Sequence, residues 1–150
     1  MRAILCSALA FLFLATLTAQ AGSADAIIKG ETASKRTNFE LHVGDLDGLV
    51  RYLKFTVDGK GYQFSEDQIS DSTVIRDQKI GVYVIVMQAE NRKFKIWMIP
   101  GSEKVKVNGP GKYRSTFAAK IEASDPRKPA EQSWRMTPVI TIGCRIDYSI

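Results

Sequence analysis

Hydrophobic and polar residues alternate along most of the chain after residue 26, with a period of two residues. This period is typical of β-strands, because successive side chains of a strand point to opposite faces of the sheet. The alternating stretches are 39–43, 53–57, 94–98, 104–107, 113–122 and 140–150. They predict strands with one face in the core and the other in solvent.

One further stretch, 80–87, is apolar at nearly every position. We expect it to form a central strand that is covered on both faces. Asp58-Gly59 and Glu90-Asn91 lie between strand segments and are typical of hairpin turns, while Pro100-Gly101 interrupts another pair. Together the pattern predicts an all-β protein. We expect a single antiparallel β-sandwich of about seven or eight strands, for which an immunoglobulin-like topology is one candidate.

Residues 1–26 have the composition of a secretory signal peptide. Arg2 precedes a nearly uncharged apolar run from Ala3 to Leu17, and small residues at Ala21 and Ala26 suit a signal peptidase. The run is shorter than the roughly 20 residues of a membrane span, and no second long apolar run follows. We therefore expect one exported domain, residues 27–150, with no transmembrane segment after signal removal, in the periplasm or secreted.

Removal of the signal would also remove Cys6 and leave Cys144 as the one cysteine of the mature chain. An intramolecular disulfide is then impossible. Cys144 is in phase with Ile142 and Ile146, so we expect a buried, unreactive thiol.

The net charge is +5, and the basic residues are concentrated in the middle of the chain. Between residues 76 and 120 there are 10 Lys and Arg against 3 Asp and Glu. The predicted strands place these cations and one tryptophan on polar faces, and the candidate binding face consists of Lys93, Lys95, Trp97, Lys104, Lys106, Arg114 and Lys120. An aromatic ring among cations suits an anionic ligand. The alternative is that these lysines only keep the sheet soluble. Trp134, in phase with Met136 and Ile140, is expected in the core.

The inventory of reactive residues disfavours catalysis. His42 is the sole histidine, so the mature chain offers one His and one Cys, whereas a metal site usually needs two or more such ligands that converge. A nucleophile–histidine dyad would have to use His42, but no Gly-x-Ser-x-Gly motif accompanies it. The acidic residues Asp45, Asp47, Glu66, Asp67 and Asp71 are interpreted as loop and turn residues. The sequence thus predicts no catalytic residue, no cofactor and no metal. Nucleic acid is disfavoured as a partner, because one exposed tryptophan falls short of a stacking platform.

The sequence therefore predicts an exported, non-enzymatic binding module. Its basic face would contact an anionic envelope component, a glycan or an acidic protein. A periplasmic or secreted inhibitor or accessory subunit that docks to a protein through a sheet edge is the alternative. A small outer-membrane β-barrel is a minor alternative.

The first prediction concerns export. We expect the mature protein to begin after Ala21 or Ala26 and to be found outside the cytoplasm, because the segment has the features that a signal peptidase recognises. N-terminal sequencing of the cellular product tests this. A product that keeps Met1, or that stays in the cytosol, would contradict it.

Overall fold

The protein is described here by a computed structural model that covers residues 26–44, 48–77 and 82–149. In these ranges the chain forms ten β-strands and two single-turn 3-10 helices. They are β1 (Ala26–Glu31), β2 (Thr37–Val43), β3 (Val50–Val57), β4 (Lys60–Ser65), η1 (Glu66–Gln68), β5 (Ile69–Asp77), β6 (Val82–Ala89), β7 (Arg92–Met98), β8 (Lys104–Gly109), β9 (Lys112–Ala123), η2 (Ala130–Gln132) and β10 (Ile140–Ser149).

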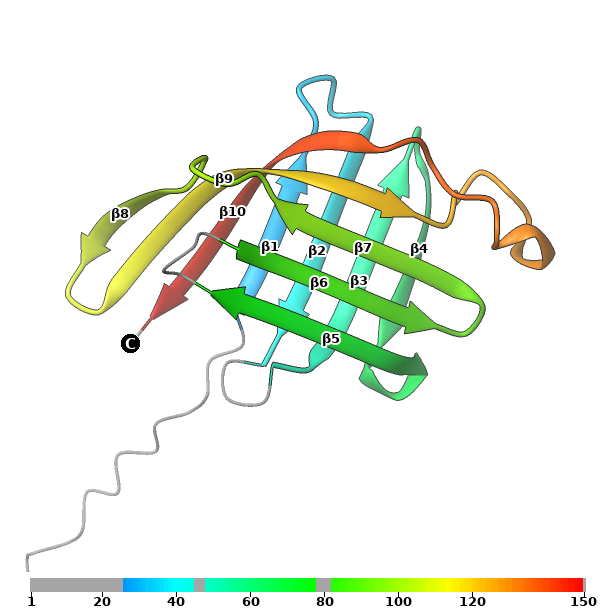
Figure 1. Ribbon diagram of the computed structural model, residues 1–150, viewed down its shortest axis with the longest axis horizontal. Coiled ribbons are helices and arrows are strands. Elements are labelled where there is room, and N and C mark those ends of the chain that lie inside the picture. Colours follow the sequence, from blue (N-terminus) through cyan, green and yellow to red (C-terminus); the bar gives the residue numbers. More distant parts are fainter. Residues whose placement is uncertain (1–25, 45–47, 78–81, 150) are drawn as a thin grey trace, which may run out of the picture.

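All ten strands belong to one antiparallel sheet (Figure 1). Its order is β4-β3-β2-β1-β10-β9-β7-β6-β5, so the last strand of the chain returns beside the first. β9 is the longest strand, and β8 and β7 share one of its edges. β8 pairs with the first half of β9 and β7 with the second half, so the β8–β9 hairpin projects beyond β5 and β6 (Figure 1).

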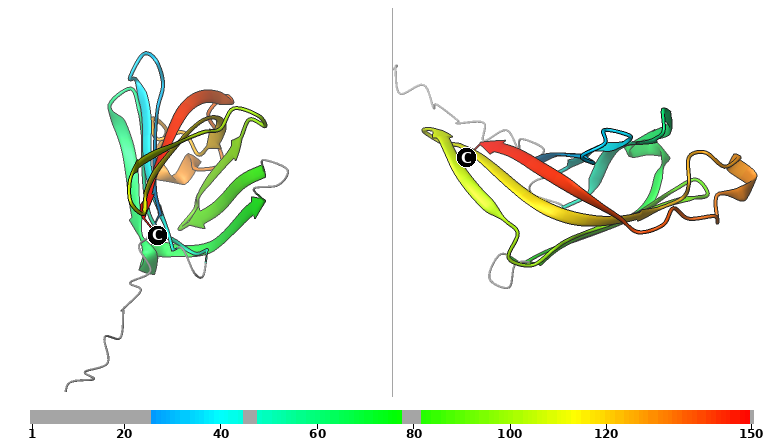
Figure 2. Two further views of the ribbon diagram at one scale, coloured as in Figure 1. Left: turned by 90° about the vertical axis from the view of Figure 1, so that its left-hand side faces the viewer. Right: turned by 90° about the horizontal axis from the view of Figure 1, so that it is seen from above.

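The sheet curls on itself into a nearly closed, barrel-like form. Strands β1–β4 make one side, β5–β7 face them, and β9 and β10 bend from one side to the other (Figure 2). The expectation of an all-β protein is confirmed. The expected sandwich of seven or eight strands is not, because the strands form one continuous sheet of ten. The difference arises at β9 and β10, which pair without interruption and join the two sides through backbone hydrogen bonds.

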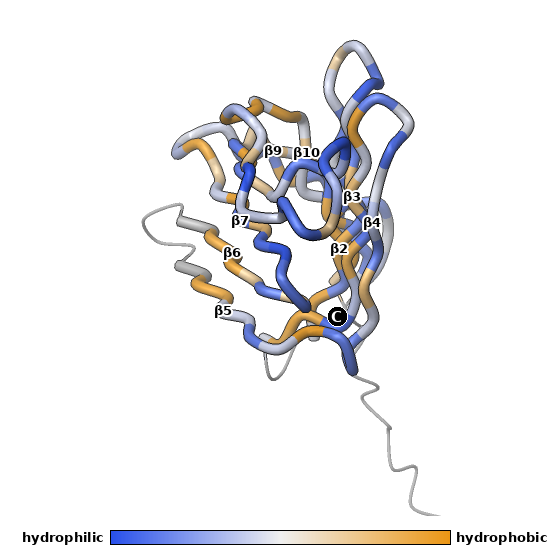
Figure 3. Tube along the Cα trace, turned by 90° about the vertical axis from the view of Figure 1, so that its right-hand side faces the viewer, coloured by the Kyte–Doolittle hydropathy of each residue, from blue (hydrophilic) through white to orange (hydrophobic). Residues whose placement is uncertain are grey.

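The core fills the space between the two sides. Phe94 of β7 packs against Phe39 of β2 and Phe55 of β3, with ring centroids 5.7 and 5.5 Å apart. All three rings are buried, and tilted or edge-on aromatic pairs of this kind are favourable beyond the area they bury. Hydrophobic residues run along both sides where these strands face each other (Figure 3).

The hairpin turns follow the sequence signals. Asp58 and Gly59 both have positive φ, 52° and 77°, as a two-residue primed turn between β3 and β4 requires. Glu90, at the turn between β6 and β7, also has a positive φ of 50°.

One expected strand is only half covered. β6 contains the described part of the apolar stretch 80–87, while residues 80 and 81 lie outside the described ranges. Ile85 and Met87 are buried, but Val86 is 43% exposed. The prediction of a strand covered on both faces is therefore wrong for its outer face, because no described element lies against Val86 on that side.

Trp134 is not in the core. Its side chain is 71% exposed, and the Arg135 guanidinium lies 5.1 Å from its ring centroid. The prediction is wrong because it extended the alternation of β10 back to residue 134. Trp134 lies in a turn after η2, where side chains do not alternate between two faces.

An ion-pair network anchors the long connection before β10. Arg127 donates to the buried carboxylate of Asp125 at 2.8 and 2.9 Å, and to Asp58 at 3.0 Å. These hydrogen bonds hold the pKa of Asp125 below its ordinary value. Arg36 completes the network with a 2.7 Å contact to Asp58. The connection is therefore tied to the β3–β4 turn.

Cys144 is buried, as its phase in the sequence predicts, with 5% of its surface exposed. Burial raises the pKa of its thiol to about 12, so little thiolate is present at neutral pH. We expect the native protein to resist thiol reagents and to react only after unfolding. Replacement Cys144→Ala should lower the free energy of unfolding by about 1–2 kcal/mol through lost packing. Timed labelling with and without denaturant measures the reactivity of the thiol, and urea denaturation measures the change in the free energy of unfolding. Fast labelling of native protein would contradict the assignment.

Gly30 is required where the Phe39 ring crosses β1. A Cβ built at Gly30 would overlap that ring. We expect Gly30→Ala to lower the free energy of unfolding by about 2–3 kcal/mol through overpacking, measured by urea denaturation. Gly143→Ala is the matched control, since its Cβ would lie 3.7 Å from its nearest neighbour, the Glu31 carbonyl oxygen. Equal losses in both variants would contradict the steric explanation.

Candidate binding face

The seven candidate residues project from one face of the sheet. Along β9, Arg114 and Lys120 lie on the same face, because their positions differ by an even number and no bulge interrupts the pairing of β9 with β10 between them. Trp97 of β7 is directly opposite Lys120, and Lys106 of β8 is directly opposite Arg114. Lys93 and Lys95 are in phase with Trp97 along β7, and Lys104 is in phase with Lys106 along β8, so they lie on the same face. We call this face, which points away from the core, the outer face. The residues form two groups, one at each half of β9.

The first group surrounds Trp97 and is here named the tryptophan patch. It consists of Ile75, Val84, Val86, Lys95, Trp97 and Lys120. Trp97 is half-buried, and the Lys95 ammonium lies 5.0 Å from its ring centroid, within cation–π range. Ile75, which shares a cross-strand row with Val84 and Trp97, is 52% exposed. The patch therefore combines an aromatic ring, exposed aliphatic groups and two flanking cations.

The second group lies on the β8–β9 hairpin. Lys104 and Lys106 are exposed and make no ion pair with a described residue. Arg114 differs, because its Nε donates to Asp147 of β10 at 2.6 Å. Asp147 also forms an ion pair with Arg145, 3.0 Å from Nε to Oδ2, so one carboxylate serves two guanidinium groups. The positive charge of Arg114 is thus partly neutralised, which the sequence interpretation did not include.

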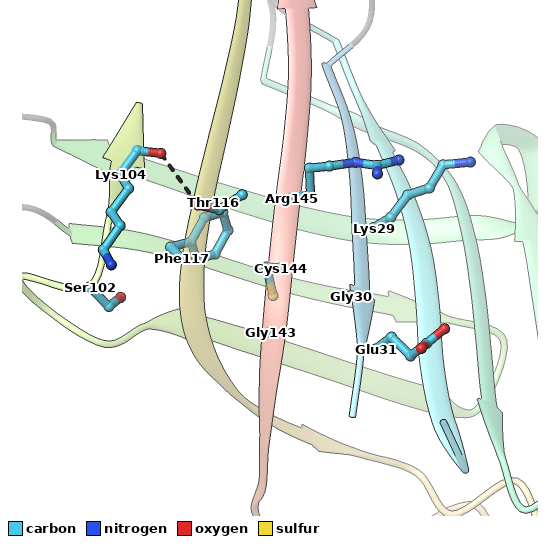
Figure 4. A pocket seen from close by; sticks show the side chains of 10 residues that line it. All are labelled: Lys29, Gly30, Glu31, Ser102, Lys104, Thr116, Phe117, Gly143, Cys144 and Arg145. Carbon is cyan, nitrogen blue, oxygen red and sulfur yellow. Dashed lines mark hydrogen bonds between the residues drawn. The ribbon is translucent and has the colours of Figure 1, made fainter. Parts of the chain in front are cut away.

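A groove crosses the outer face between these two groups. Its volume is about 490 Å³, within the range of small-ligand sites. The charged and polar groups along it include Lys29, Glu31, Lys104, Thr116 and Arg145 (Figure 4). Gly143 contributes no side chain, and its partner on β9 is Ala118, so small residues leave the space open.

One wall of the groove is a row of cations across four strands. Lys104, Thr116, Arg145 and Lys29 are direct cross-strand neighbours on β8, β9, β10 and β1. The row spans roughly 14 Å at ~4.8 Å per strand. Arg145 and Lys29 are like charges placed opposite each other, an arrangement that costs stability. Glu40 offsets part of this cost through a 2.9 Å ion pair with Lys29.

Glu40 remains ionised over a wide pH range. Its hydrogen bond with His42, 2.8 Å between Nε2 and Oε1, and then its bond with Lys29 hold the pKa of Glu40 below its ordinary value. The His42 ring also packs against Tyr52, with ring centroids 5.0 Å apart and the ring planes tilted by 54°. The histidine thus supports the carboxylate that neutralises Lys29.

The groove residues Lys29, Arg145 and Gly143 are not among the candidates that the sequence indicates. A signal was present, since the alternation of β10 already places Gly143 and Arg145 on its polar side. Lys29 lies in a part of the chain that has no excess of cations. Only the pairing of β1 with β10 brings it beside Arg145.

The acidic residues give no alternative centre in the described ranges. Asp45 and Asp47 lie outside these ranges, whereas Glu66 pairs with Arg51 at 2.8 Å and Asp67 accepts from Ser65 at 2.7 Å. No group of three or more His, Cys, Asp or Glu side chains suited to a metal ion occurs among the described residues. Neither of the short helices found in those residues has the length and hydropathy needed to span a membrane.

Comparison of the chain with protein-family models, with curated proteins and with solved structures finds no match.

Proposed function

We propose that this protein is an exported, non-enzymatic binding module that holds an anionic glycan on the outer face of its sheet. The observation that carries the proposal is the groove, whose cationic row of Lys104, Arg145 and Lys29 lies on the same face as the tryptophan patch. Cations can pair with acidic groups of the glycan, while the indole offers a stacking surface.

The geometry favours a glycan over the two other anionic partners considered, an acidic protein and another envelope component. A groove of about 490 Å³ gives an extended chain of sugar units room to lie along the sheet. The row of cations runs across the strands, so it suits an extended ligand with several negative groups. The Thr116 hydroxyl, between Lys104 and Arg145, adds a neutral hydrogen-bonding group of the kind that sugars match.

Binding of an anion would be favoured by the positive charge that is crowded along the row. Arg145 and Arg114 share Asp147, and Lys104 has no acidic partner among the described residues, so the row keeps an excess of positive charge. An anionic ligand would relieve the repulsion between Arg145 and Lys29. Lys95 can leave the Trp97 ring to pair with the ligand, because a cation–π contact at a partly exposed site is worth only about 0.5–1 kcal/mol.

The experiment measures binding of the mature chain to dextran sulfate, with uncharged dextran as the control polymer. We expect binding that weakens as salt rises, because exposed charges are screened over ~8 Å at physiological ionic strength. Gly143→Val should reduce affinity about tenfold by filling the groove. It should leave the free energy of unfolding unchanged or raised, because its Cβ has space and valine favours strands. Thr141→Val, on the same face of β10 but outside the groove lining, is the matched control.

Charge and aromatic variants separate the two parts of the face. The pair Lys93→Glu and Lys95→Glu should slow association at low salt, since peripheral charges mainly steer encounter. The same reversal at the exposed Lys60 and Lys128 is its control. Trp97→Ala should instead speed dissociation. If the first pair leaves binding at low salt unchanged and Gly143→Val does too, the face does not bind this polyanion and the proposal is wrong.

A further inference from the structure

β8 is an edge strand with both faces uncovered. It pairs with β9 on one edge and with no other described strand. On its inner side Val105 and Val107 are 56% and 64% exposed. The other sheet edges differ, because Phe64 of β4 is buried and Val74 of β5 packs against the core. Among the described edge strands, β8 thus differs from β4 and β5 in that the apolar side chains on its inner face are exposed.

The position of β8 keeps this edge accessible. Ser102 accepts from the Ala118 N–H at 3.1 Å and donates to the Ile99 carbonyl at 2.6 Å, which fixes the link between β7 and β8 against β9. β8 then runs along the outer half of β9, beyond the ends of β5 and β6 (Figure 1). A strand added there would not compete with any described strand for that edge.

The two faces of β8 carry different chemistry. Lys104 and Lys106 lie on the outer face and the two valines on the inner face. Lys106 is opposite Arg114, a like charge that is itself paired with Asp147. β9 therefore supplies no counter-charge for Lys106. Acidic residues on a strand added at the free edge would supply it.

A second copy of the same strand does not fit. If two β8 strands paired with valines opposite valines, lysines would also be opposite lysines, because the two types alternate. Like charges directly opposite each other destabilise a strand pair. Lysine on an edge strand is a common device against self-association for this reason.

We propose that the free edge of β8 docks an extended protein segment in which acidic and apolar residues alternate, and adds it to the sheet as a further strand. The acidic residues lie opposite Lys104 and Lys106, and the apolar residues lie opposite Val105 and Val107. This inference goes beyond the glycan site, since it uses the backbone edge of β8, its inner-face valines and Lys106, and shares only Lys104 with the groove.

The test titrates the mature protein with a fluorescent, end-capped peptide of alternating glutamate and valine. Saturable binding is expected, with protection of β8 amides from hydrogen exchange. A peptide of the same composition in non-alternating order should bind about tenfold more weakly, because it cannot match both faces. The absence of saturable binding of the alternating peptide up to about 1 mM would overturn the proposal.

Variants of β8 test whether the peptide binds at the free edge of this strand. The pair Val105→Thr and Val107→Thr keeps strand propensity and should weaken peptide binding about tenfold. The same change at the exposed Val139, which lies outside the tryptophan patch and the groove, is the control and should leave peptide binding unchanged. Lys106→Glu should weaken the glutamate–valine peptide and improve binding of a lysine–valine peptide. If these variants bind the peptide as wild type does, or if protection lies on β4 or β5, the assignment to β8 is wrong.

The experiment also separates this proposal from the glycan site. Gly143→Val should weaken dextran sulfate binding about tenfold and leave peptide binding unchanged, whereas the pair Val105→Thr and Val107→Thr should weaken peptide binding about tenfold and leave dextran sulfate binding unchanged. A concentration-dependent dimer with protected β8 amides in the absence of peptide would overturn the choice of partner. Circular dichroism and urea denaturation establish that each variant is folded.

Discussion

The unbroken pairing of β9 with β10 is the constraint on which the rest of the structure depends. Ten consecutive residue pairs join these strands, from Lys112–Ser149 to Ile121–Ile140. Because no bulge interrupts them, every second side chain of β9 faces outward over its whole length. The shared edge of β9 then aligns β7 with one half and β8 with the other, so cations from distant parts of the chain reach one face.

The same strands also create the space between the two groups of the face. β9 bends as it passes from one side of the barrel-like sheet to the other, and the pairing of Gly143 with Ala118 leaves no bulky side chain between the rows of Thr116 and Lys120. The core tolerates this opening, because Phe39, Phe55 and Phe94 pack together from opposite sides. Stability and the groove thus depend on different faces of the sheet.

The cations of the outer face differ in whether an acidic residue lies beside them. Acidic residues accompany some cations, as Glu40 does Lys29 and Asp147 does Arg145, but they are too few to neutralise the row. The lysines of β8 have no acidic partner among the described residues, and the alternation of lysine and valine disfavours pairing between two β8 strands. One strand can therefore serve the groove through Lys104 and still present a backbone edge to a different kind of partner.

By itself the sequence determined the all-β class, the two-residue turn at Asp58-Gly59, the burial of Cys144 and the side of the strand on which Lys93, Lys95 and Trp97 lie. These properties follow from local alternation and turn preference. Tertiary structure alone decided that one sheet of ten strands closes on itself, that Val86 is left exposed, and that Lys29 meets Arg145. Such outcomes depend on which strands pair and in which register, and a period of two is the same for every pairing. Trp134 shows where this kind of prediction stops working, since alternation says nothing about burial once the chain leaves a strand.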